Sequence, residues 1–151
     1  MAEHLKVARL YFVILGVFAV GRWLQGTVGH APYDKAHHVF SIVILSWTSA
    51  FYYGAFCRRW RGYRLGQVAV LALVLALASQ VVILLATMLS YALGIDTFFT
   101  HPRALNTDGP VPFGRALVIR LSGLVANCVI SVILGTLGWA MGALLPEPKR
   151  T

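Results

Sequence analysis

The sequence predicts an all-α integral membrane protein: a bundle of four transmembrane helices in one domain, residues 1–151. Three observations lead to this prediction. Hydrophobic residues make up 58% of the chain and charged residues only 12%, whereas soluble domains average about 25% charged residues. Residues 68–95 contain no charge, and as a helix they would measure about 42 Å, more than the ~30 Å hydrocarbon core of a bilayer. Three further apolar segments accompany this stretch.

The first span is expected at about residues 7–24. Arg9 at its start and Arg22 with Trp23 at its end suit the two membrane interfaces. A cleaved signal peptide is the alternative, because Lys6 and Arg9 resemble the basic leader of such a peptide. Arg22 and Trp23 directly after the apolar run favour a membrane anchor instead.

The second span is expected at 39–56, the third at 68–95 and the fourth at 116–145. Pro146 marks the end of the fourth helix, since proline cannot continue one. The longest connection, 96–115, separates the third and fourth spans. Its three prolines favour an irregular loop that holds at most a short helix.

Basic residues are distributed unevenly over the connections. Four spans put both termini on one side, and that side would carry eight of the thirteen lysines and arginines, four of them in the connection 57–67. Such residues are enriched on the cytoplasmic side. We therefore expect both termini in the cytoplasm and the protein in a bacterial inner (plasma) membrane. The net charge of +8 then reflects topology and contact with the lipid bilayer, and no nucleic acid is expected as a partner.

Small residues recur on one face of the fourth span. They are Cys128, Ser131, Gly135, Gly138 and Gly142. Steps of three and four residues place them on one side of a helix, and small residues allow the close packing that holds helices together in lipid. The stripe either holds the bundle together or faces another protein, which would be a different membrane subunit or a second copy of this chain.

The expected topology gathers ionisable residues on the outer side. These residues are His30, Asp34, His37, His38, Asp96 and His101. Imidazole and carboxylate groups suit zinc or copper, and a histidine cluster would also respond to external pH. The alternative is a purely interfacial role. The candidate metal ligands are His30, His37, His38 and His101. No cofactor is expected; zinc or copper is the open alternative, and haem is disfavoured because the first, third and fourth spans contain no histidine.

One charged residue, Arg120, and two amides, Gln80 and Asn127, fall inside the third and fourth expected spans. Arg120 lies about 7 Å inside the start of the fourth span, and a charge in a span is a functional candidate. It can extend to the interface, pair with Asp96 or Asp108, or hold an anion or lipid headgroup. Gln80 and Asn127 are expected near the bilayer midplane, where they would bond to each other or line a polar pathway.

The sequence contains no recognisable catalytic signature, so we expect no enzyme. The first functional hypothesis is a non-catalytic accessory or assembly subunit of a larger membrane complex, because the chain is small and carries small-residue stripes. The alternative is a small oligomeric transporter or channel whose pathway includes Gln80, Asn127 and Arg120. A membrane protein or enzyme that binds metal or haem within the membrane is the third hypothesis.

Overall fold

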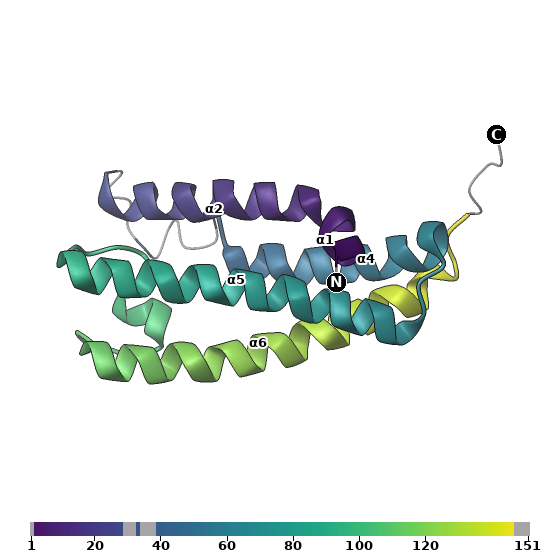
Figure 1. Cartoon of the computed structure of the whole chain (residues 1–151). Coiled ribbons are helices and arrows are strands. Elements are labelled where there is room, and N and C mark those ends of the chain that lie inside the picture. The colour runs from purple at the N-terminus through teal and green to yellow at the C-terminus, as the bar shows by residue number, and fades with distance from the viewer. Residues whose placement is uncertain (1, 29–32, 34–38, 147–151) are drawn as a thin grey trace.

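The regular structure of the chain is helical throughout the part that the structure describes, residues 2–28, 33 and 39–146 of a computed structural model (Figure 1). The helices are α1 (Ala2–Val7), α2 (Arg9–Thr27), α4 (Ile42–Arg61), α5 (Leu65–Leu93), the 3-10 helix η1 (Pro102–Leu105) and α6 (Phe113–Gly142). The four long helices run alternately in opposite directions along the chain. The predicted all-α class is confirmed.

Three helices, α2, α5 and α6, are long and apolar enough to cross a membrane. Their length and composition support the assignment of a membrane protein. The helix α4 is not among them. Its C-terminal turn carries Arg58, Arg59 and Arg61, and Tyr52 and Tyr53 occupy its middle, so its mean hydropathy is lower. The second of the four predicted spans therefore stays a prediction.

The helix ends differ from the predicted bounds by a few residues, for local reasons. The helix α4 continues through its arginines and ends at Gly62, whose φ of 66° lies in the left-handed region where glycine carries no steric cost. The helix α5 likewise ends at Gly94, with φ 62°. The helix α6 begins directly after Pro112, since proline suits the start of a helix.

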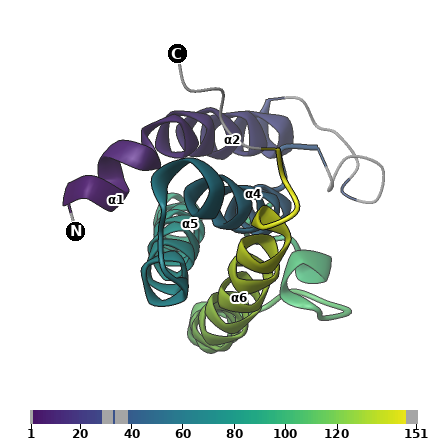
Figure 2. The same ribbon diagram turned by 90° about the vertical axis from the view of Figure 1, so that its right-hand side faces the viewer.

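The helices α4, α5 and α6 form the tightly packed part of the bundle, and α2 lies over α4 and α5 (Figure 2). A polar contact joins α2 to α5: the Tyr11 hydroxyl donates a hydrogen bond to the carbonyl oxygen of Leu75 at 2.9 Å. Both residues are almost completely buried.

The closest approach in the bundle is between α4 and α6. A Cβ added at Gly138 would overlap the carbonyl oxygen of Phe51, and one at Gly54 would overlap that of Gly135. The backbones of the two helices therefore touch without intervening side chains. The whole predicted stripe on α6 is buried: Cys128, Ser131, Gly135, Gly138 and Gly142. Its glycines pack inside the bundle and are not available to another protein.

The loop between α5 and α6 contains one turn of 3-10 helix, η1, so the prediction of at most a short helix there is confirmed. The segment η1 lies beside α6, beyond the N-terminal end of α4 (Figure 1). We call this end of the molecule the η1 end. The opposite end, where α4 turns into α5 through Gly62, is called the arginine-turn end.

Candidate functional site

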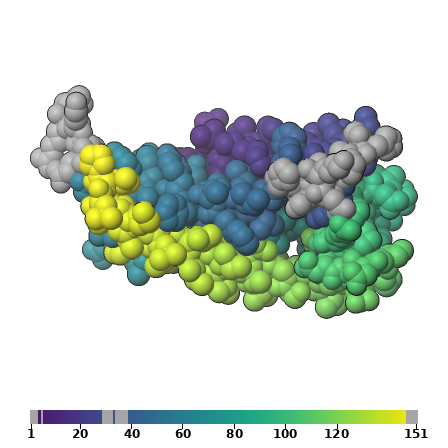
Figure 3. All heavy atoms as spheres, turned by 180° about the vertical axis from the view of Figure 1, so that it is seen from behind, coloured from purple at the N-terminus to yellow at the C-terminus, as the bar shows by residue number. Residues whose placement is uncertain are grey.

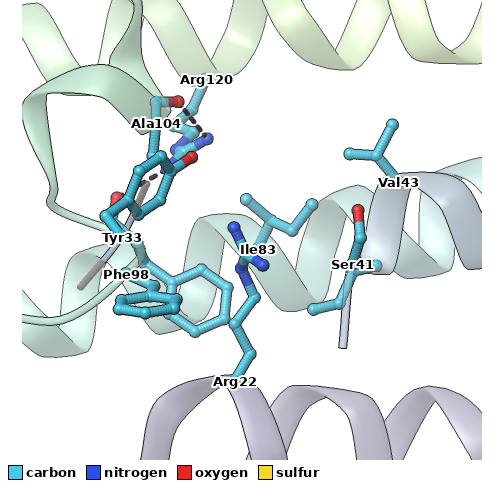
Figure 4. A pocket seen from close by; sticks show the side chains of 10 residues that line it. Arg22, Tyr33, Ser41, Val43, Ile83, Phe98, Ala104 and Arg120 are labelled. Carbon is cyan, nitrogen blue, oxygen red and sulfur yellow. Dashed lines mark hydrogen bonds between the residues drawn. The ribbon is translucent and has the colours of Figure 1, made fainter. Parts of the chain in front are cut away.

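Arg120 extends from α6 into the space between α5 and the η1 loop (Figure 4). Its Nη2 donates to the carbonyl oxygen of Phe99 at 2.6 Å, and its Nη1 donates to that of Ala104 at 3.4 Å. Its Nε donates to Thr87 Oγ1 on α5 at 3.2 Å. All three acceptors are neutral oxygens, and a guanidinium carries five N–H donors. The positive charge of Arg120 is therefore hydrogen-bonded but not neutralised by these contacts.

The structure does not pair Arg120 with Asp96 or Asp108. Both aspartates are exposed, and the hydrogen bonds of Arg120 go to the three oxygens of Phe99, Ala104 and Thr87. Within the described ranges, no carboxylate compensates this half-buried charge. An uncompensated charge in a membrane helix is costly, and such residues are candidates for ligand binding.

A second arginine, Arg22 from α2, points toward the same space (Figure 4). Its guanidinium carbon lies 5.6 Å from the ring centroid of Phe98 and 6.0 Å from that of Phe99, distances typical of cation–π contacts. Tyr33 interacts with both arginines, and the charges of Arg22 and Arg120 act on each other. Two cations and a phenol hydroxyl therefore converge from α2, α6 and the connection that follows α2.

These groups line a cavity of about 190 Å³. A second cavity, of about 480 Å³, adjoins it along α6 and is lined in part by Gln80 and Asn127. The two cavities share the lining residues Val43, Ile83, Ala104 and Arg120. We call the two cavities together the arginine cleft. Arg120 stands at their junction.

The arginine cleft opens on the side of the bundle between α4 and α6. Ser122 and Ala126, which line its longer part, are exposed. Figure 3 shows this face, where α4 and α6 separate on approaching the η1 end. Toward the arginine-turn end, the backbone contact between Gly54 and Gly135 closes the space between the same two helices.

The two amides inside the predicted spans line the cleft but do not bond to each other. The Asn127 side chain donates to the carbonyl oxygen of Gly123 at 2.8 Å and accepts from Trp47 Nε1 at 3.1 Å. Gln80 is only 5% exposed, and among the described residues its Nε2 has no hydrogen-bond partner. Asn127 therefore serves the contact between α4 and α6, whereas Gln80 presents a buried donor that is not used.

The predicted histidine group is only partly described. His30, Asp34, His37 and His38 lie outside the described residues. Asp96 and His101 line a separate cavity of about 470 Å³ in the η1 loop. The His101 ring stacks on Tyr33, with centroids 4.3 Å apart, and its Nδ1 accepts from the backbone N–H of Arg103. Considering the described residues alone, no three His, Cys, Asp or Glu side chains lie close enough to hold a metal ion.

The sequence pattern does not reveal the partners of Arg120 in the cleft. It predicts Arg22 at the membrane interface and marks no role for Tyr33, Phe98 or Phe99. Two signals are present in the sequence: Arg22 is a charge next to an apolar run, and the pair Phe98–Phe99 lies two residues beyond the end of the third span. Nothing in the spacing could show that these segments meet.

Comparisons of the chain with protein-family models, with curated proteins and with solved structures find no match.

Proposed function

We propose that this chain is a small transporter that receives an anionic ligand in the arginine cleft. The observation that carries this proposal is that Arg120, Gln80 and Asn127, the one charge and the two amides of the third and fourth expected spans, line the same cavity. A cation and an unused amide donor are costly to keep away from water. A ligand that supplies negative charge and hydrogen-bond acceptors would remove both costs.

The proposal includes the topology expected from the sequence: four spans, with both termini cytoplasmic, in a bacterial inner membrane. The η1 end then faces outward, so the lateral opening of the cleft would lie in the outer half of the bilayer. The glycine contacts between α4 and α6 would seal it toward the cytoplasm. A site open toward one half of the membrane and closed toward the other is what alternating access requires of one state. Because four helices enclose little space, we expect the transporter to work as an oligomer.

The structure weakens the support for an accessory or assembly subunit. One observation in its favour is the small-residue stripe of the fourth span, but the glycines of that stripe pack on α4. The other two observations, small size and the absence of catalytic signatures, do not distinguish a subunit from a transporter.

Flux through proteoliposomes tests the proposal. Three anionic probes would be compared: radiolabelled phosphate, radiolabelled acetate and a fluorescent lysophosphatidic acid whose transbilayer movement is followed by dithionite quenching. At least one probe should cross about ten times faster with the protein than in protein-free vesicles, and Arg120→Gln should abolish that gain. Arg115→Gln is the matched control, because Arg115 is an exposed residue of the same helix. No gain with folded protein for any probe, or an equal gain with Arg120→Gln, would overturn the proposal.

A further inference from the structure

We infer that the ligand of the arginine cleft is an anionic amphiphile, a single-chain lipid with a phosphate head, which enters from the bilayer. This inference rests on the proposed function for the role of the cleft and adds the chemical class of the ligand. Three separate features of the cleft lead to it: the place for the head, the path for the chain, and the unused donor of Gln80.

The head would lie in the smaller cavity. There Arg120 and Arg22 approach from opposite sides and Tyr33 offers a hydroxyl group (Figure 4). Arginine forms forked, charge-assisted hydrogen bonds with phosphate oxygens. The cavity volume of about 190 Å³ equals that of several water molecules at roughly 30 Å³ each, which is enough for a phosphate group but not for an acyl chain.

The chain would lie in the larger cavity. Its wall is mixed: Val43, Ile83 and Ile119 give it an apolar side, and its polar members are Gln80, Asn106, Arg120, Ser122 and Asn127. Its opening lies beside Ala126, on a face of α6 whose neighbouring residue Val125 is exposed and would meet lipid. A water-soluble anion needs neither an apolar wall nor a lateral opening. An amphiphile needs both, because its chain can then pass from the bilayer into the cleft without crossing water.

Gln80 supplies the third feature. Its side chain is more than nine-tenths buried, lines the larger cavity and leaves Nε2 without a hydrogen-bond partner. Gln80 precedes Thr87, the hydroxyl partner of Arg120, by two helical turns of α5, or about 10 Å at 1.5 Å per residue. The extended side chain of Gln80 can bring Nε2 closer to Thr87 than this rise along the helix axis. Nε2 is thus placed to donate to an acceptor in the body of the ligand, such as the ester carbonyl of a lysophospholipid.

The test is binding to the full chain in a non-ionic detergent, followed by native mass spectrometry. The probes are oleoyl-lysophosphatidic acid, oleoyl-lysophosphatidylcholine with the same chain but no net charge, and inorganic phosphate. We expect one lysophosphatidic acid per chain, bound at least ten times more tightly than lysophosphatidylcholine and not displaced by millimolar phosphate. Arg120→Gln should weaken it at least tenfold, Arg120→Lys should restore binding only in part, and Arg115→Gln should leave it unchanged.

Gln80→Leu separates a role in binding from a role in folding. Leucine removes the unused buried donor, so the free protein should melt at a higher temperature while the affinity for lysophosphatidic acid falls at least threefold. A change of both quantities in the same direction would contradict the assigned role. Equal binding of the two lysolipids, or binding of inorganic phosphate with the same dependence on Arg120, would overturn the inference in favour of an unselective apolar site or of a soluble anion.

Failure of the inferred ligand class can be distinguished from failure of the proposed transport function. Selective binding of lysophosphatidic acid without any flux would reject transport and keep the ligand class. Flux of radiolabelled phosphate that depends on Arg120, without binding of the lysolipid, would reject the ligand class and keep transport.

Discussion

The indole N–H of Trp47 on α4 donates a hydrogen bond to the side-chain oxygen of Asn127 on α6 at 3.1 Å. This bond joins the two helices at the inner limit of the arginine cleft, where their separation gives way to backbone contact. It links the stability of the bundle to the shape of the candidate site.

We expect Trp47→Phe and Asn127→Leu each to lower the free energy of unfolding, and the double variant to lose less than the sum. Hydrogen bonds between helices in membranes contribute about 0.6 kcal/mol on average, up to about 1.7 kcal/mol. A double-mutant cycle from reversible unfolding in mixed micelles measures this coupling. Strictly additive losses would show that the bond contributes nothing to stability.

Gly138→Ala should destabilise the bundle by about 1–3 kcal/mol, the usual cost of overpacking, because the new methyl group meets the carbonyl oxygen of Phe51. Gly123→Ala on the same helix is the control, since no atom lies within 4 Å of its added Cβ. Alanine also favours helix over glycine, so the control should be neutral or stabilising. Melting temperatures in one detergent check both variants, and equal effects would contradict the α4–α6 contact.

Tyr11→Phe should weaken the attachment of α2, because it removes the hydrogen bond to the carbonyl oxygen of Leu75 and leaves that buried oxygen without this donor. The expected loss is about 1 kcal/mol in the free energy of unfolding. Tyr52→Phe is the matched control, since Tyr52 is 59% exposed on α4. If α2 is held by this bond, limited proteolysis should release it faster from Tyr11→Phe than from the control. Identical release rates would count against this role.

The four-span topology predicts which residues reach each side of the membrane. Cys57 and Cys128 are buried and free and would be replaced by alanine. In that background, Asp108→Cys should react with an impermeant maleimide in intact cells, whereas Arg61→Cys should react only after permeabilisation. Both positions are exposed, so accessibility depends on the side of the membrane alone. Labelling of Arg61→Cys from outside would reverse the assigned orientation.

The helical class, the long apolar helices and the small-residue face of α6 follow from the sequence alone. These properties are local. A run without charges forms a helix whose length follows from its rise per residue, and small residues at three- and four-residue steps must share a face. The helix ends follow a different rule, because Gly62 and Gly94 terminate helices by adopting left-handed backbone conformations, whereas the apolar pattern places these ends at residues 56 and 95.

What each helix face contacts becomes visible only in the folded bundle. Counting residues put Gln80 and Asn127 at a similar depth, but their direction around the helix axis sent Asn127 to Trp47 and left the Nε2 of Gln80 without a partner. The approach of Arg22 to Arg120 has the same origin. The depth of a residue along a helix follows from the sequence of that helix. The rotation of the helix about its axis is set by its contacts with the other helices, which depend on the whole bundle.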